Sequence, residues 1–246
     1  MPSTDASPRR ALLKRAIGFL PAALRALRDK AFPSQGEFPS ERPSPLRGKA
    51  YEPLKRRLDI ALSLGGIAAL SPLMAAVAVA IRLESDGPAL FRQKRLGLNG
   101  EGFEFLKFRS MCADAEKDGV YSGEGDPRVT RVGRFIRATS LDELPQLFNV
   151  LRGDMSLIGP RPVLTYHPWA FDAYSPEQRR RFEVRPGLTG WAQIHGRRNV
   201  EWSRRLAYDA WYVEHLSLRL DAEIFLKTLG QVLLSKNNLN VGETAS

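Results

Sequence analysis

The amino-acid sequence predicts a mainly α-helical protein that is associated with a membrane and contains one short β-hairpin. Residues 60–81 form a long segment without any charge, and amphipathic helical spacing dominates the C-terminal third. Two strand-type segments flank an Asn-Gly turn within residues 88–111. The 246 residues are enough for one or two domains with a sizeable buried core.

The composition excludes several classes of protein. Hydrophobic residues make up 43% and charged residues 26% of the chain, so neither wholesale disorder nor a polytopic membrane protein fits. Cys112 is the only cysteine, which rules out an internal disulfide and a cysteine-based zinc site. The reducing cytosolic side of a membrane is the natural setting for such a chain.

The positive charge is concentrated near the N-terminus. The formal net charge is +10, and residues 1–57 hold 13 basic and 5 acidic side chains, which leaves only +2 for residues 58–246. A basic segment beside an apolar stretch favours contact with anionic lipids and a cytoplasmic location. Nucleic-acid binding is less favoured, because residues 1–57 contain no recognisable nucleic-acid fold and no basic patch interleaved with aromatic residues.

We expect residues 1–54 to be a basic N-terminal extension. Residues 11–32 have the pattern of one or two short amphipathic helices that lie on the membrane surface, with an unfolded tail as the alternative. Charges interrupt every apolar run there, so a secretory signal is not expected. Five prolines among polar residues in 33–53 predict a linker.

Residues 55–83 contain the predicted membrane helix. The uncharged residues 60–81 would measure ~33 Å as a helix, enough to cross a hydrocarbon core of about 30 Å. Pro72 frees the carbonyl of Ala68 from its helical bond, and Ser71 offers a hydroxyl that compensates it. Basic residues flank both ends, so the positive-inside rule assigns both to the cytoplasm. These residues alone leave two alternatives, a re-entrant helix bent at Ser71-Pro72 and a kinked spanning helix.

Residues 84–246 are expected to form a cytosolic domain. It begins with the hairpin in 88–111, whose turn is Asn99-Gly100. The loop at 123–133 has no phosphate-binding pattern of the Gly-x-Gly-x-x-Gly or Walker type. Leu216–Leu234 is amphipathic with a large apolar face, for which core packing is the default and membrane-surface contact the alternative.

The richest cluster of chemically useful residues lies between Arg137 and Pro162. Asp142 and Glu143 precede an apolar helix face that ends at Gly153. Ser140 and Glu143 match a capping box, so the acidic pair could serve only to cap a helix. The alternative is chemical, because a helix N-terminus and a nearby guanidinium both favour the ionised carboxylate that a nucleophile or a Mg²⁺ ligand requires.

The same residues suit phosphoryl transfer. Mg²⁺ commonly binds one or two carboxylates and completes its shell with water and phosphate oxygens, a role open to Asp142 and Glu143. Arg137 and Arg161 could hold those phosphate oxygens in bidentate contacts. An ordinary surface ion pair would also explain Arg137.

Several motifs occur in a specific order. They are KRRLD (55–59), the apolar segment broken at Ser71-Pro72, FRQKRLG (91–97), FLKFRSM (105–111), SLDELPQLFNVLRGDMSLIGPRP (140–162) and RPGLTGWAQIHGR (185–197). In this combination the chain resembles the bacterial sugar transferases, or monotopic phosphoglycosyl transferases, from about Lys55 to its last helices. It differs from the minimal family pattern by about 50 extra N-terminal residues.

The resemblance implies a reaction and a location. A UDP-sugar donates its sugar 1-phosphate to undecaprenyl phosphate and releases UMP, as the first membrane step of polysaccharide or glycoconjugate assembly. The resemblance implies that Asp142 is the nucleophile of a covalent intermediate, supported by Glu143 and Mg²⁺, and that Arg137 and Arg161 bind phosphate. It also implies a re-entrant helix in the bacterial cytoplasmic membrane, with the catalytic domain lying on its cytoplasmic face.

Some assignments stay open at this level. Lys107 and Arg109 have a place near the active site by resemblance, but solvated strand residues are an equal alternative. The rival functions are a ternary-complex transferase with Asp142 as a base and a non-enzymatic, membrane-anchored basic adaptor. His195 has no identifiable carboxylate partner, so it is not assigned as a base. The sugar, the pathway and the oligomeric state do not follow from the sequence.

Overall fold

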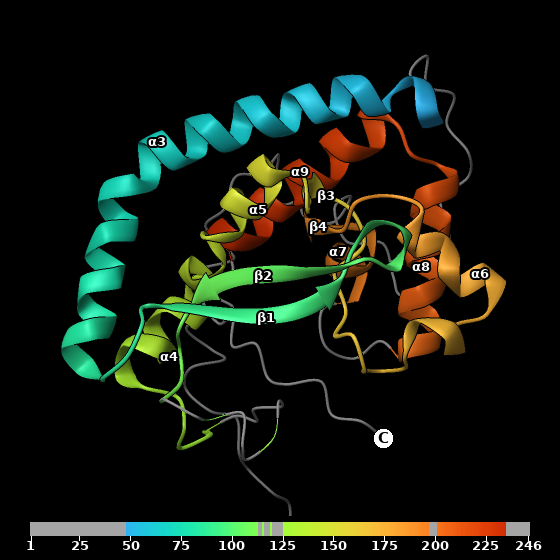
Figure 1. Ribbon diagram of the computed structural model, residues 1–246. Coiled ribbons are helices and arrows are strands. Elements are labelled where there is room, and N and C mark those ends of the chain that lie inside the picture. Colours follow the sequence, from blue (N-terminus) through green and yellow to red (C-terminus); the bar gives the residue numbers. More distant parts are fainter. Residues whose placement is uncertain (1–47, 113–114, 116–118, 120–124, 197–200, 235–246) are drawn as a thin grey trace, which may run out of the picture. The chain divides into compact units, whose positions relative to one another are not determined.

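Helices dominate the described part of the chain, as the sequence predicts. The computed structural model describes residues 48–112, 115, 119, 125–196 and 201–234 (Figure 1). The predicted N-terminal helices at 11–32 lie outside the described residues. The helices are α3 (Glu52–Glu84), α4 (Arg131–Ala138), α5 (Gln146–Arg152), α6 (Pro176–Arg179), α7 (Trp191–Gly196), α8 (Trp202–Glu214) and α9 (Leu218–Leu234). The strands are β1 (Leu90–Leu96), β2 (Gly102–Phe108), β3 (Ser156–Ile158) and β4 (Gly187–Thr189).

α3 contains the predicted membrane segment. Among the described residues it is the one helix long and apolar enough to cross a membrane. It continues through Pro72 as one helix and bends sharply within its length (Figure 1). The Ser71 hydroxyl donates to the Ala68 carbonyl oxygen at 3.1 Å, which confirms the predicted compensation for the missing backbone donor. The bend agrees with either a re-entrant or a kinked spanning helix.

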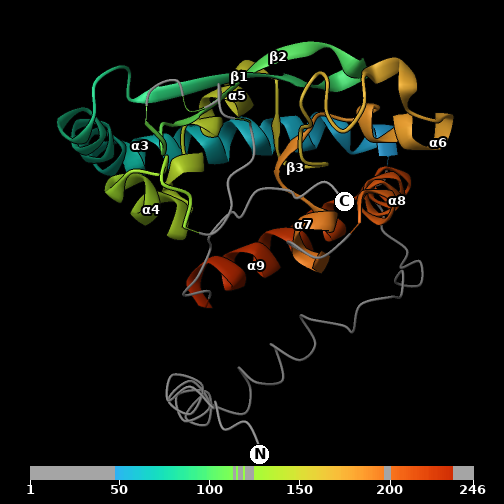
Figure 2. The same ribbon diagram turned by 90° about the horizontal axis from the view of Figure 1, so that it is seen from below.

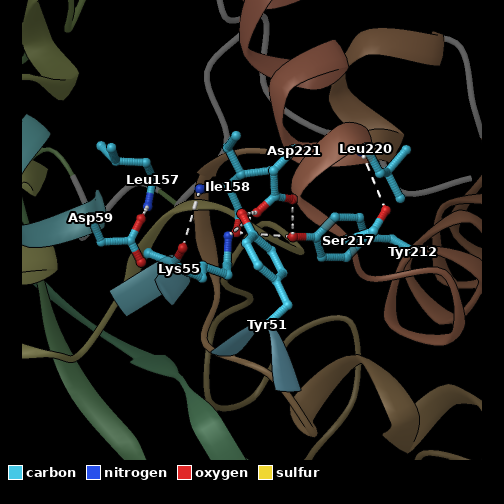
Figure 3. Close-up of polar contacts among 10 residues, drawn as sticks. Tyr51, Lys55, Asp59, Leu157, Ile158, Tyr212, Ser217, Leu220 and Asp221 are labelled. Atoms are coloured by element: carbon cyan, nitrogen blue, oxygen red, sulfur yellow. Dashed lines mark hydrogen bonds and ion pairs between the residues drawn. The ribbon is translucent and has the colours of Figure 1, made fainter. Parts of the chain in front are cut away.

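The N-terminal end of α3 packs into the core of the folded domain. Tyr51 is 1% exposed, and its hydroxyl donates to Asp221 Oδ2 of α9 at 3.0 Å. Lys55 Nζ lies 2.5 Å from the same oxygen, and the Tyr212 hydroxyl donates to Asp221 Oδ1 at 2.7 Å (Figure 3). The predicted linker is therefore too long at its C-terminal end, because Gly48–Ala50 form a 3₁₀ helix, α3 begins at Glu52, and Tyr51 between them is buried in the core.

The predicted hairpin is confirmed. β1 and β2 pair antiparallel from Leu90 opposite Phe108 to Leu96 opposite Gly102. Positive φ angles at Asn99 and Gly100, 54° and 78°, make the turn between them. The sequence analysis did not predict the second sheet, in which β3 and β4 pair in parallel.

α5 packs against both α3 and the hairpin (Figures 1 and 2). The side chain of Asn149 is fully buried at this contact. Its Oδ1 accepts from the Leu106 amide at 3.0 Å, and its Nδ2 donates to the Glu104 carbonyl at 2.6 Å. The hairpin is thereby fixed against the helix that follows Asp142 and Glu143.

Core packing of the C-terminal helix is confirmed for one face of α9, and membrane-surface contact of its other face stays a prediction. Leu220 and Ile224 are buried in a core shared with α7 and α8, as core packing predicts. Phe225 and Leu226 are 45% and 66% exposed on the helix surface. One face of α9 therefore holds the fold together, and the other leaves apolar surface uncovered.

Candidate active site

Asp142 and Glu143 lie in a 3₁₀ turn, η4 (Leu141–Glu143), between α4 and α5. The capping-box interpretation of this pair is wrong. An N-cap residue normally has an extended backbone, whereas Ser140 is left-handed with φ 59°, and its side chain makes no capping bond to the turn. α5 itself starts after Pro145, again without a side-chain cap. A capping role therefore does not explain the acidic pair.

Asp142 is a buried carboxyl group. The residue is 4% exposed, and its Oδ1 has no hydrogen-bond partner within the described part of the chain. Burial raises the pKa of Asp142 to about 7, and the charge of Glu143 adds to this effect. The positive charges of Lys107, Arg137 and Arg161 act in the opposite direction. The guanidinium groups thus favour the ionised form as the sequence predicts, but burial, which the sequence does not reveal, outweighs them.

Glu143 is held by Arg161. Arg161 Nη2 donates to Glu143 Oε1 at 2.7 Å. Burial alone would raise the pKa of Glu143, but Arg161, followed by Lys107 and Arg95, lowers it overall. Arg161 follows β3 in the Gly-Pro-Arg-Pro turn, so two segments distant in sequence meet at this ion pair.

Lys107 and Arg137 lie in the electrostatic field of the acidic pair. Lys107 comes from β2, where burial and the neighbouring Arg95 lower its pKa to about 8 while Asp142 counteracts them. Arg137 is in the last turn of α4, and burial lowers its pKa against the opposing charge of Asp142. The structure thus brings five predicted side chains into one electrostatic cluster: Asp142, Glu143, Lys107, Arg137 and Arg161.

Arg109 does not join this cluster. Its buried guanidinium donates through Nη2 to the Ser85 carbonyl at 2.7 Å and the Ser85 hydroxyl at 3.0 Å, and through Nη1 to the Asp86 carbonyl. These contacts close the C-terminal end of α3. β2 ends at Phe108, so the alternation that would place Arg109 on the same face as Lys107 stops before it. Arg109 therefore has a structural role at the end of α3, and a contact between Arg109 and phosphate stays a prediction.

Arg95 is a site residue that the sequence analysis did not single out. Its guanidinium lies 4.2 Å from the centroid of the Phe105 ring, and Nη1 donates to the Pro162 carbonyl at 2.7 Å. Arg95 thereby ties β1 to the Gly-Pro-Arg-Pro turn. Its signal was present in the motif FRQKRLG, but the motif alone does not distinguish this arginine from its basic neighbours.

The motif RPGLTGWAQIHGR packs against the Gly-Pro-Arg-Pro turn that carries Arg161. Its glycines cross the Gly-Pro-Arg-Pro turn at backbone distance: a Cβ on Gly187 would lie 2.1 Å from Gly159 N, and one on Gly190 would lie 2.0 Å from Gly159 O. The ring of His195 lies against Trp191, with ring centroids 3.9 Å apart and planes tilted by 41°, and burial lowers the pKa of His195. This motif positions Arg161, and His195 belongs to the packing.

The carboxylate pair fits a hard divalent cation. The described residues contain no group of three or more His, Cys, Asp or Glu side chains at metal-binding distance. Mg²⁺ does not need such a group, since it retains water and phosphate ligands beside one or two carboxylates. Asp142 Oδ1 supplies an oxygen without a hydrogen bond within the described residues, whereas Arg161 already holds one oxygen of Glu143.

Comparisons with known proteins agree with this site. The sequence pattern of the family described as bacterial sugar transferase matches residues 50–235. The chain is 48% identical over 199 residues to the UDP-glucose:undecaprenyl-phosphate glucose-1-phosphate transferase of Caulobacter vibrioides, over 78% of this chain and 74% of that protein.

Two further relatives are longer proteins. The chain is 46% identical over 195 residues to the UDP-N-acetylgalactosamine-undecaprenyl-phosphate N-acetylgalactosaminephosphotransferase of Aeromonas hydrophila, over 78% of this chain and 45% of that protein. It is 39% identical over 189 residues to the UDP-glucose:undecaprenyl-phosphate glucose-1-phosphate transferase of Escherichia coli, over 74% of this chain and 41% of that protein. The chain therefore spans less than half the length of these two relatives.

Proposed function

Because the chain belongs to the bacterial sugar transferase family, we propose that it transfers a sugar 1-phosphate from a UDP-sugar to undecaprenyl phosphate through a covalent intermediate on Asp142. It is a phosphoglycosyl transferase, so the alternative of a non-enzymatic adaptor no longer applies. The names of the three relatives include UDP-glucose, UDP-N-acetylgalactosamine and undecaprenyl phosphate. The donor is accordingly a UDP-hexose or a UDP-N-acetylhexosamine.

The observation that carries the proposal is the buried, unpartnered Oδ1 of Asp142 among cationic side chains. Leaving a buried acceptor without a hydrogen bond costs about 1–3 kcal/mol. A group that only stabilised the fold would gain from a partner, whereas an attacking oxygen must not be held by a hydrogen bond inside the protein. The positive charges of Lys107, Arg137 and Arg161 favour the ionised carboxylate that attacks, against the burial that raises its pKa to about 7.

The reaction proceeds in two displacements at the same phosphorus atom. In the first, a carboxylate oxygen of Asp142 attacks the β-phosphorus of the UDP-sugar, the bond to the bridging oxygen breaks, and UMP leaves. In the second, a phosphate oxygen of undecaprenyl phosphate attacks that phosphorus, and the Asp142 carboxylate leaves with its electron pair. The products are UMP and undecaprenyl-diphosphate-sugar, and the enzyme returns to its starting state.

The surrounding residues bind and orient the reacting phosphates. Arg161 and Arg137 bind the diphosphate oxygens, and Lys107 offers a third positive charge. Glu143, fixed by Arg161, would hold Mg²⁺ together with Asp142. When bound there, Mg²⁺ would neutralise charge that develops on the phosphate oxygens and lower the pKa of the attacking carboxyl group.

The proposed location is the cytoplasmic face of the bacterial inner membrane. α3 enters the bilayer and, bent at Ser71-Pro72, returns to the same side. The largely exposed apolar residues of α3 support its insertion into the bilayer, and the basic residues that flank both ends of the uncharged segment support its return to the same side; the bend allows that return. A water-soluble nucleotide sugar and a lipid phosphate then reach one carboxylate without crossing a phase boundary. Anionic lipids would contact the basic residues on this face.

UMP release by the purified full-length protein tests the proposal. We expect release with at least one member of a panel of UDP-sugars in the presence of undecaprenyl phosphate and Mg²⁺. Asp142→Asn should abolish release, whereas Asp172→Asn, a matched change at an exposed aspartate, should not affect it. A burst of UMP without the lipid acceptor would favour the covalent route, and a strict requirement for acceptor would favour a ternary complex. Asp142→Asn with near-normal release would refute the proposal.

A further inference from the structure

Charged side chains at both ends of α3 contact the segments that carry the site residues. The basic run Lys55-Arg56-Arg57 looks like a topological signal in the sequence. Lys55, however, is buried in its ion pair with Asp221, Arg56 is half-buried, and only Arg57 is exposed. Two of the three positive charges therefore serve contacts inside the protein.

Arg56 donates hydrogen bonds to the C-terminal end of α5. Its Nη1 donates to the Val150 carbonyl at 2.5 Å and its Nη2 to the Leu151 carbonyl at 2.8 Å. Carbonyls in the last turn of a helix have no partner within the helix, and a positive charge there matches the helix dipole. The opposite end of α5 directly follows η4, which carries the nucleophile. Arg56 thus fixes the helix from which the acidic turn extends.

Asp59, one turn further along α3, holds β3. Its side chain is 4% exposed, and Oδ1 accepts from the Leu157 amide at 3.0 Å (Figure 3). β3 leads directly into the Gly-Pro-Arg-Pro turn, where Arg161 binds Glu143. The first two turns of α3 therefore hold two of the four segments that meet at the site, the segment without such a contact to a charged residue of α3 being β2 with Lys107.

Glu84, in the last turn of α3, holds a third segment. Its Oε1 accepts from the Arg131 amide at 2.7 Å and its Oε2 from the Val132 amide at 2.9 Å. Amides in the first turn of a helix have no acceptor within the helix, and a negative charge at the N-terminus of α4 also matches the helix dipole. Arg137 lies in the last turn of the same helix. Glu84 thus fixes α4 at the end opposite to its site residue.

We propose that α3 positions the active site as well as anchoring the protein, with Arg56, Asp59 and Glu84 as positioning residues. This inference rests on the proposed function of Asp142. None of the three touches the reacting groups. Each binds one end or edge of a short helix or strand, and a site residue lies at or just beyond the other end. Loss of the contact would let the whole element shift, and the site residue would shift with it. Misplacement of about 1 Å can cost about 100-fold in rate.

Matched substitutions in the full-length protein in lipid nanodiscs test the inference. Arg56→Met is compared with Arg57→Met, which removes the same charge from the neighbouring exposed position and so controls for a topological effect. Glu84→Gln is compared with Glu101→Gln at another exposed glutamate. We expect kcat to fall about 10- to 100-fold in Arg56→Met and Glu84→Gln, with little change in the two controls. Glu84→Asp, which can still cap a helix, should recover part of the loss.

Amide hydrogen exchange provides a readout that does not depend on turnover. Residues 137–145 should exchange about tenfold faster in Arg56→Met and Glu84→Gln than in their controls, while α8 is unchanged. Equal kcat and exchange in variant and control would overturn the inference, as would faster exchange throughout the chain. If the wild-type protein transferred no sugar phosphate, the proposed function would fail, and exchange alone would decide the positioning role.

Discussion

Loss of the Asp221 charge should strongly destabilise the fold, because Asp221 binds the N-terminal end of α3. Asp221 accepts from Tyr51, Lys55 and Tyr212, and both it and Lys55 are less than one-tenth exposed. Asp221→Asn keeps the size and one acceptor oxygen, but it replaces the other oxygen by an NH2 donor and leaves the Lys55 ammonium buried without its counter-charge. Breaking a buried ion pair in this way costs about 3–5 kcal/mol. For a chain of this length, such a loss corresponds to a decrease in Tm of about 10 °C.

Thermal unfolding of the purified protein in a fixed detergent measures this loss, with Asp172→Asn as the exposed control. The double variant Lys55→Met/Asp221→Asn removes the stranded charge and should recover more than half of the lost stability, which gives a large coupling in the double-mutant cycle. A Tm of Asp221→Asn within about 2 °C of the wild type would refute the reasoning. So would a double variant no more stable than Asp221→Asn.

Three further predictions concern topology, the ion pair and the metal. In a Cys112→Ser background, cysteines near residues 50 and 90 should both react from the cytoplasmic side; labelling of only one contradicts the re-entrant arrangement, and Pro72→Ala should give mixed labelling. Arg161→Met removes the partner of Glu143 and should lower kcat/KM about 10- to 100-fold, whereas Arg161→Lys should keep part of the activity. An unchanged kcat/KM in Arg161→Met would contradict this prediction. EDTA should abolish UMP release and Mg²⁺ should restore it; activity that resists EDTA would exclude the metal.

Local patterns in the sequence predict the elements that depend on local chemistry. The Asn99-Gly100 turn requires positive φ angles, and these two residue types adopt them readily. Gly153 ends α5 with φ 96° for the same reason. Ser71 stands one residue before Pro72, so the rescue of the Ala68 carbonyl follows from their spacing. Each of these predictions needs only a few neighbouring residues.

Features that depend on contacts distant in sequence were wrong or missed. The capping box failed because Ser140 adopts a left-handed turn between α4 and α5, which the Ser-x-x-Glu spacing does not reveal. Resemblance of the motif FLKFRSM gave Arg109 a place near the site, with a solvated strand residue as the alternative; the contact of its guanidinium with Ser85 at the end of α3 follows from neither. The raised pKa of Asp142 follows from burial, and burial depends on how α5 and the hairpin pack together. The pairing of β3 with β4 joins three-residue strands that carry no periodic signal.

The most direct test of the central claim is the mass of the peptide that contains Asp142. The protein is incubated with a UDP-sugar that supports UMP release, without undecaprenyl phosphate, and then digested under conditions that preserve acyl phosphates. The peptide should gain the mass of one sugar phosphate, lose it when undecaprenyl phosphate is added, and never gain it in Asp142→Asn. Turnover with no adduct at Asp142, or an adduct on another residue, would contradict the assignment of Asp142 as the nucleophile.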